Sequence, residues 1–182
     1  MTFLVASRRM SPQTIHKRFG DVLIYDVTSR GPEPWVRFSP FYPHGNIPVP
    51  FSSGQTGMSV EGIWQGLKVF ETADVDPTKL TITTMKNIKR TVRRFGAVLG
   101  HRVGLEGDRL LGYEEARRTI YLPSYRWVLD HCLQQEIASL RRLGEQTTVV
   151  LLDYETNGDI SDVSRPLSHA ALIVAYLNEE WP

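Results

Sequence analysis

Residues 59–70, "SVEGIWQGLKVF", carry a carboxylate, an amide and an amine at regular intervals. At 100° per residue, Glu61, Gln65 and Lys68 fall within a narrow stripe of a helix, opposite an apolar face. A carboxylate at a helix start can act as a general base on water, and a lysine two turns along can hold a phosphate or stabilise a departing anion. An ordinary amphipathic helix with its polar face in water is the alternative interpretation.

Two glycines, Gly62 and Gly66, lie on a flank of this polar stripe. Each glycine inside a helix costs roughly 0.5–1 kcal/mol relative to alanine. Two of them one turn apart therefore indicate that another group approaches this flank closely. We interpret this flank as the wall of a cleft.

The segment before this helix, residues 29–57, combines most of the prolines with many aromatic side chains. A polar linker would not carry Trp35, Phe38, Phe41, Tyr42 and Phe51, so the segment is typical of a binding loop. Aromatic rings of such a loop can stack on a heterocyclic base. With a carboxylate nearby to stabilise an oxocarbenium-like transition state, the set favours hydrolysis of an N-glycosidic bond.

The remaining elements are expected from capping and periodicity. Helices are predicted for 11–19, for 60–72, for one or two stretches of 76–100, and for 167–181 with Ser168 near its start. A further helical segment, 112–144, is interrupted at Pro123, resumes as a strong amphipathic helix over 124–143 and ends at Gly144. Strands are predicted for 21–28 and 147–154, and a turn-rich loop for 155–166. This order favours a helix-rich α+β fold with a small, mainly antiparallel sheet.

The composition narrows the function classes. The 182 residues suit a single domain, and a formal charge of +1 argues against a general nucleic-acid binder, although a local basic groove remains compatible with it. The single cysteine, Cys132, rules out an internal disulfide, and no histidine or cysteine spacing indicates a metal site. No apolar run approaches a membrane span, and no signal peptide is evident, so we expect a cytoplasmic protein without a cofactor or membrane partner.

Two motifs resemble the NADAR superfamily, also called YbiA-like. "FSPFYP" is similar to its "FSNF(Y/A)P" motif, and "SVEGIWQGLKVF" to its "S-E-H-x-(F/Y)-Q-A-x-K" helix, with Gly62 where histidine is usual. The smaller residue at this position implies an enlarged pocket. Arg102 in "LGHRVG" and the acidic "DYETNGDISD" are looser matches, and the Trp-Gly that follows in the family is absent. The resemblance spans most of 35–177. It implies one domain over 1–182, with 1–30 as an N-terminal extension and 31–182 as the NADAR-like domain.

The resemblance implies a metal-free N-glycosidase acting on a small nucleotide, an ADP-ribosyl group or a ribosylamino-pyrimidine phosphate, with modified nucleic acid as another substrate. The implied catalytic residues are Glu61, Asp159 and Asp162. The implied substrate-binding residues are Trp35, Arg37, Phe38, Ser39, Phe41, Tyr42, Ser59, Trp64, Gln65, Lys68 and Arg102. Among them, Lys68 and Arg102 would hold phosphate.

Two other interpretations stay open from the sequence. The chain is compatible with a non-catalytic module that binds nucleotide or ADP-ribose as a sensor or sequestering protein, and with a small interaction protein built on an inherited scaffold. The basic run "KNIKRTVRRF" at 86–95 is either a solvated helix face or a phosphate-binding rim. Among the histidines, His101 stands out because it adjoins Arg102.

Overall fold

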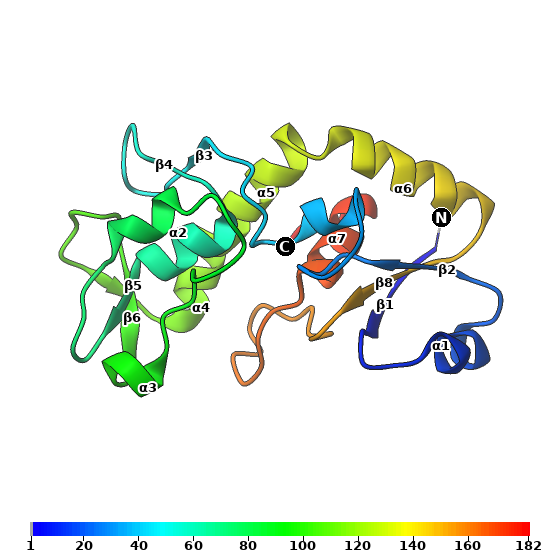
Figure 1. The fold of residues 1–182 in the computed structure, drawn as a ribbon, viewed down its shortest axis with the longest axis horizontal. Helices are drawn as coiled ribbons and strands as arrows, with labels where there is room; N and C mark the ends of the chain where they lie inside the picture. Colours follow the sequence, from blue (N-terminus) through cyan, green and yellow to red (C-terminus); the bar gives the residue numbers. More distant parts are fainter. Residues whose placement is uncertain (1) are drawn as a thin grey trace. The chain divides into compact units, whose positions relative to one another are not determined.

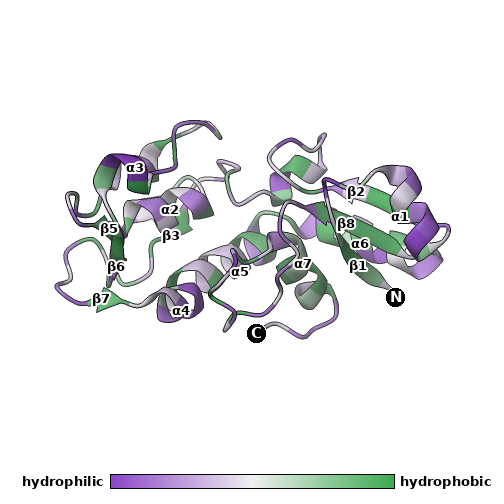
Figure 2. Cartoon of the chain, turned by 90° about the horizontal axis from the view of Figure 1, so that it is seen from below, coloured by the Kyte–Doolittle hydropathy of each residue, from purple (hydrophilic) through white to green (hydrophobic). Residues whose placement is uncertain are grey.

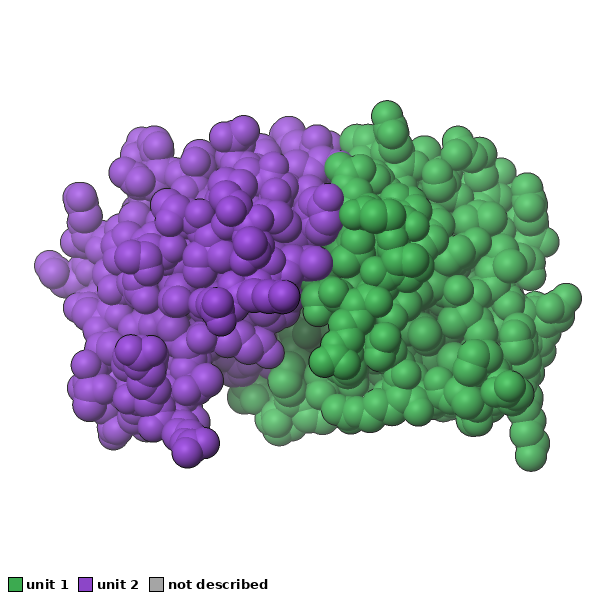
Figure 3. Space-filling model, in the orientation of Figure 1, with its two compact units in different colours: residues 1–39, 133–182 green, residues 40–132 purple. Residues whose placement is uncertain are grey.

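A computed structural model describes residues 2–182, which form helices and three small β-sheets (Figure 1). Contacts divide the chain into two compact units, coloured separately in Figure 3. The terminal unit comprises residues 1–39 and 133–182, and the central unit comprises residues 40–132. One sheet is parallel and two are antiparallel, and the predicted α+β class is confirmed.

The terminal unit is built around a parallel sheet in the order β1-β8-β2. Strand β8 (Val149–Asp153) lies between β1 (Phe3–Ser7) and β2 (Leu23–Asp26), so the segment 1–30 supplies both of its neighbours. Val149, Val150 and Leu151 are fully buried, as expected for a central strand covered on both faces, and β1 and β8 are mainly hydrophobic (Figure 2). The predictions of strands at 21–28 and 147–154 are confirmed.

Three helices and one 3-10 turn complete the terminal unit. They are α1 (Pro12–Phe19), η1 (Trp35–Phe38), α6 (Gln134–Gln146) and α7 (His169–Leu177). Ser11 caps α1 and Ser168 caps α7, because each hydroxyl accepts a hydrogen bond from a backbone N–H of the first turn. Both helix starts agree with the sequence prediction. Ile15 of α1 packs with Ala6, Val22 and Val150 in the core.

The central unit holds two antiparallel sheets. β3 (Ile47–Pro48) pairs with β4 (Thr56–Gly57), while β5 (Lys68–Phe70), β6 (Val98–Arg102) and β7 (Leu110–Leu111) form the second sheet. The helical elements are α2 (Val60–Gly66), the 3-10 turn η2 (Pro77–Thr81), the short α3 (Val92–Phe95), α4 (Tyr113–Ala116), the π-helical turn η3 (Arg117–Tyr121) and α5 (Leu122–His131). The last three follow one another without a break.

The predicted helix over 60–72 is too long. It ends at Gly66, and the chain continues as β5, because the Leu67 carbonyl accepts a hydrogen bond from the backbone N–H of Arg102. The prediction of one or two helices over 76–100 is also largely wrong. That stretch contains η2, the four-residue α3 and the start of β6. Pairing with β5 therefore overrides local helix propensity here.

The predicted helix over 124–143 is divided into α5 and α6, with Cys132 and Leu133 between them. Pro123 is not an interruption, because it lies in the first turn of α5, where its missing N–H costs little. Gly144 does not end α6, which continues to Gln146. A Cβ on Gly144 would lie 2.4 Å from the Phe3 ring, so this glycine allows α6 to pack closely on β1.

Candidate active site

The candidate catalytic carboxylate lies in the first turn of α2, in the central unit. Ser59 caps this helix through its Oγ, which accepts a hydrogen bond from the Gly62 N–H at 3.0 Å. Every residue of α2 is buried, and Glu61 keeps only 8% of its surface exposed. The alternative interpretation of an ordinary solvent-facing stripe is therefore wrong. Ser59, expected to bind substrate, holds the helix start instead.

Gln65 holds Glu61 in place. Its Nε2 donates to Glu61 Oε1 at 2.9 Å, and its own Oε1 accepts from the backbone N–H of Arg90 at 3.0 Å. Both ends of the amide are thus engaged within the protein. We conclude that Gln65 is a positioning residue for the carboxylate and not the free substrate-binding amide that the resemblance implies.

Arg90 ties α2 to the segment after it. Its guanidinium donates to the backbone carbonyls of Gln65, Lys68 and Asp74, at 3.2, 2.5 and 2.6 Å, and lies over the rings of Phe70 and Phe95. The side chain is only 7% exposed. One of the five basic residues in the run 86–95 therefore stabilises the fold and faces neither water nor a phosphate.

The two ionisable groups of the stripe shift each other's protonation. Burial raises the pKa of the Glu61 carboxyl, while the hydrogen bond from Gln65 and the charges of Lys68 and Lys89 oppose that rise. Burial lowers the pKa of the Lys68 ammonium; Glu61 opposes this, and Lys89 and Arg90 add to it. Burial therefore moves the pKa values of both groups toward neutral pH, where acid–base catalysis is most effective.

Gly62 and Gly66 are approached closely, as predicted, but by the protein itself. A Cβ on Gly62 would lie 2.6 Å from the Lys79 carbonyl oxygen, and one on Gly66 would lie 3.3 Å from the Asp76 carbonyl oxygen. The backbone of η2 occupies this flank of α2. The interpretation of Gly62 as the sign of an enlarged ligand pocket is wrong, because a carbonyl group fills that space.

A cavity of about 350 Å³ opens beside the other end of the stripe. Its wall includes Lys68, Val98, Leu99, His101, Gly112 and Tyr113. Lys68 and His101 are opposite each other in the β5–β6 pairing, which places both at this wall. The Lys68 ammonium lies 5.7 Å from the Trp64 ring and has no hydrogen-bonded or ion-paired partner among residues 2–182.

An aromatic cluster surrounds Trp64 next to the cavity. Its ring centroid lies 3.7 Å from that of His101, 5.9 Å from Tyr113 and 5.7 Å from Tyr121. Tyr121 ends the π-helical turn η3, a rare element that is frequent at functional sites. Arg117, which begins the turn, is 2% exposed and lies over the Tyr113 ring at 4.5 Å.

The remaining candidates of the central unit lie apart from this wall or are engaged. Arg102 donates two hydrogen bonds of 2.7 Å to the Asp74 carboxylate and a third to the Asp108 carbonyl. It follows His101 on β6, so its side chain points to the opposite face of the strand. Phe41 lies under the Lys89 ammonium at 5.4 Å, and Tyr42 packs against His44.

Four candidates from the aromatic segment belong to the terminal unit. Trp35 packs against Tyr25 and stacks on Phe38, and Phe38 and Ser39 are buried. Arg37 forms an ion pair with the buried carboxylate of Glu136 on α6. The "FSPFYP" motif is therefore divided between the two units after Ser39.

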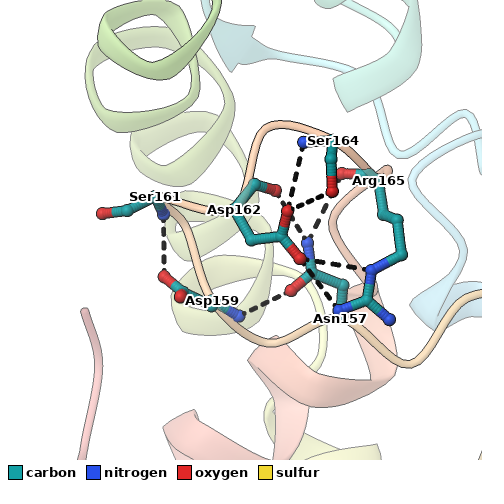
Figure 4. Close-up of polar contacts among 6 residues, drawn as sticks. All are labelled: Asn157, Asp159, Ser161, Asp162, Ser164 and Arg165. Atoms are coloured by element: carbon teal, nitrogen blue, oxygen red, sulfur yellow. Dashed lines mark hydrogen bonds and ion pairs between the residues drawn. The ribbon is translucent and has the colours of Figure 1, made fainter.

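Asp159 and Asp162 also belong to the terminal unit and organise the loop 155–166 (Figure 4). Asp159 Oδ1 accepts from the Ser161 N–H, and Asp162 accepts from Ser164 and pairs with Arg165. Ser164 and Arg165 lower the pKa of Asp162 to about 2, so it is ionised at neutral pH. These contacts give both carboxylates a role in shaping a turn.

Two residues near the site, Tyr113 and His101, were not selected from the sequence as ligands or catalysts, and Lys89 was considered only as part of the basic run 86–95. His101 has no exposed surface, and neither ring nitrogen has a hydrogen-bond partner within residues 2–182. Burial and the charge of Lys68 lower its pKa to about 3, so the ring is neutral. Its position beside Arg102 was the only sequence signal, and the pairing with Lys68 is a tertiary property.

Within residues 2–182, no group of three or more histidine, cysteine, aspartate or glutamate side chains is arranged to hold a metal ion. No helix in that range has the length and apolar character needed to cross a membrane.

Comparison with known proteins gives one match. Residues 7–173 match the family described as "Family of unknown function (DUF6939)". Neither a curated protein nor a solved structure matches the chain.

Proposed function

The chain belongs to the family of unknown function DUF6939, and we propose that it hydrolyses the N-glycosidic bond of a nucleotide-derived substrate in its central unit. The observation that carries this proposal is the buried Glu61, oriented by Gln65 and lying close to the amine of Lys68, which has no hydrogen-bonded or ion-paired partner within residues 2–182. The substrate would be of the ADP-ribosyl-guanine or ribosylamino-pyrimidine phosphate type, as the resemblance to the NADAR superfamily implies.

In the proposed reaction, Glu61 removes a proton from water as the water oxygen bonds to the anomeric carbon. The carbon–nitrogen bond breaks, its electron pair leaves on the base nitrogen, and the proton held by Glu61 passes to that nitrogen. A carboxyl group whose pKa is raised by burial suits this exchange, because it can both take and return a proton near neutral pH. The carboxylate also stabilises positive charge that develops on the sugar.

The phosphate of the substrate would be held by Lys68 and Lys89. Both ammonium groups are close enough to lower the pKa of Glu61, and Lys89 is exposed at the surface. Arg102 is a weaker candidate for this role than the sequence predicts, because its guanidinium already binds Asp74 and the Asp108 carbonyl. Basic groups around one carboxylate would also attract an anionic substrate.

A second candidate is a non-catalytic module that binds nucleotide or ADP-ribose. The observation that favours it is the low exposure of Glu61, 8%, together with its absence from the lining of the cavity that Lys68 borders. A carboxylate closed off from water would position Lys68 by its charge and would not activate a nucleophile. Cytoplasmic location and small-molecule partners are part of both candidates.

The test compares the wild-type protein with Glu61→Gln and with the matched control Glu106→Gln, an exposed glutamate of the same unit. Each is incubated with ADP-ribosylated guanine nucleic acid, ribosylamino-pyrimidine phosphate and NAD, and the released base is measured by mass spectrometry. Loss of general acid–base catalysis should lower turnover about 100-fold or more in Glu61→Gln and leave the control unchanged. Tight binding without turnover would favour the binding module, and neither binding nor turnover would refute both.

A further inference from the structure

The cavity beside β6 combines apolar and polar side chains in its wall. Val98, Leu99 and Tyr113 give it apolar sides with exposed fractions of 42%, 55% and 42%, so these side chains remain partly open to solvent. Apolar groups gathered around a concave site are typical of a surface that binds a ligand. Lys68 and His101 supply the polar groups at the same wall.

His101 is the residue in this wall that the fold leaves unsatisfied. A buried hydrogen-bonding group normally has a partner, and both nitrogens of this ring lack one within residues 2–182. Trp64 covers one side of the ring at a centroid distance of 3.7 Å. A ligand group that hydrogen-bonds one ring nitrogen would remove part of the cost of burying it.

The charges around the cavity restrict the ligand. Lys68 has no paired anion within hydrogen-bonding distance among residues 2–182; Glu61 acts on it with the opposite charge, and Lys89 and Arg90 act on it with the same sign. Because burial and Lys68 hold the pKa of His101 near 3, the imidazole is uncharged and adds one donor and one acceptor. A cationic ring in this cavity would face three basic side chains against one carboxylate, whereas an uncharged ring with an acceptor atom would bind to Lys68.

We infer that this cavity is the subsite for an uncharged heteroaromatic group, the leaving base of the proposed reaction, and that His101 is its hydrogen-bond partner. The inference rests on the proposed function for the identity of that group as a leaving base. It deepens that function by excluding N-glycosyl pyridinium compounds such as NAD, whose ring carries a positive charge until the glycosidic bond breaks. The Tyr113 and Trp64 rings provide the aromatic contacts that a flat heterocycle needs.

The first measurement is binding of free heterocycles to the wild-type protein. Hypoxanthine serves as the uncharged probe, and 1-methylnicotinamide, a pyridinium methylated on the ring nitrogen, as the cationic probe of similar size. We expect hypoxanthine to bind at least about tenfold more tightly by calorimetry, because a like charge beside Lys68 is unfavourable. Equal or tighter binding of the cationic probe would overturn the inference.

The second measurement identifies the residue. In protein labelled with ¹⁵N-histidine, hypoxanthine should shift the ring nitrogens of His101 and leave those of His131, an exposed histidine of the same unit, unchanged. His101→Phe keeps the ring volume and removes both nitrogens, so it should weaken hypoxanthine binding about tenfold, whereas the control His131→Phe should not. If His101→Phe does not fold, the ring shift in the wild-type protein decides the question alone.

Failure of this inference is distinguishable from failure of the proposed function. Hypoxanthine that shifts His101 in a protein without turnover would leave the subsite standing and refute the hydrolysis. Turnover of an N-glycoside by a protein in which no base shifts His101 would leave the hydrolysis standing and refute the subsite.

Discussion

Replacing Asp153 with asparagine removes one charge from a buried ion pair in the terminal unit. Asp153 ends β8, and its Oδ2 lies 2.9 Å from His169 Nδ1 and accepts from Ser168 Oγ at 2.8 Å. Its Oδ1 accepts from the Tyr154 N–H at 2.7 Å. His169 Nε2 lies 2.9 Å from the Val27 carbonyl oxygen, so both ring nitrogens face acceptors and the imidazole is held protonated.

The magnitude follows from this burial. Asp153 is 5% exposed and His169 7%, and removal of one partner of a buried pair typically costs about 3–5 kcal/mol. Asparagine keeps the shape and one acceptor oxygen, so we expect Asp153→Asn to lower the free energy of unfolding by about 3 kcal/mol. For a chain of this length that corresponds to a fall in Tm of about 6–12 °C.

The pH dependence of stability tests the same ion pair independently. Burial lowers the pKa of His169, but the charge and hydrogen bond of Asp153 outweigh it and raise this pKa above its usual 6.5. The stabilisation that protonated His169 contributes is therefore complete below pH 6.5 and is lost as pH rises through the raised pKa. His169 and Ser168 lower the pKa of Asp153 below its usual 3.8 despite burial, so that stabilisation is lost only as pH falls through the lowered value. The pair therefore contributes fully between about pH 4 and 6.5.

The assay is urea unfolding followed by circular dichroism at several pH values. Asp153→Asn should reduce the transition midpoint without changing its slope, and it should abolish the alkaline loss of stability due to His169. Asp159→Asn is the matched control: an exposed carboxylate of the same unit whose turn contact an amide oxygen can also make, so it should change stability by less than about 0.5 kcal/mol. A loss below about 1 kcal/mol in Asp153→Asn, or an unchanged alkaline dependence, would refute the role assigned to the pair.

Two further predictions concern the central unit. Gly62→Ala places a Cβ 2.6 Å from the Lys79 carbonyl oxygen, so despite the higher helix propensity of alanine it should lower the free energy of unfolding in urea by about 1–2 kcal/mol. Gly66→Ala, whose new Cβ has its nearest contact at 3.3 Å, should lower the free energy of unfolding by less. The reverse order of the two losses would contradict this packing. Arg102→Ala breaks a pair with Asp74, which is 62% exposed, and should cost less than about 1 kcal/mol, with a smaller loss at high salt; a loss that is larger and independent of salt would show that Arg102 has a different role.

Helix starts and the buried strand could be predicted from the sequence because they depend on neighbouring residues. The helix starts at Ser11 and near Ser168 are predictable because a hydroxyl next to an apolar-periodic segment satisfies free N–H groups of the first turn. Strand β8 was identified because a short run of β-branched and apolar residues is what a strand buried on both faces requires. In each case the energy depends on residues within a few positions of one another.

The site followed this rule only in part. The spacing of Glu61 and Gln65 predicted their contact, because residues four apart on a helix are neighbours. Lys68 is not part of the helix, because α2 ends at Gly66 and Lys68 begins β5, whose partner β6 lies about 30 residues later in the sequence. That pairing, which no local pattern encodes, placed Lys68 opposite His101.

Sequence patterns alone predict where α2 starts, the close approach to Gly62 and Gly66, and the α+β class. Tertiary structure decided what approaches those glycines, which is the backbone of η2, and which basic side chains are engaged, which are Arg90 and Arg102. It also decided that Glu61 is buried and not solvated. The physical reason is that burial and charge at each of these atoms are set by segments distant in sequence, and pKa values and hydrogen-bond satisfaction depend on that surrounding.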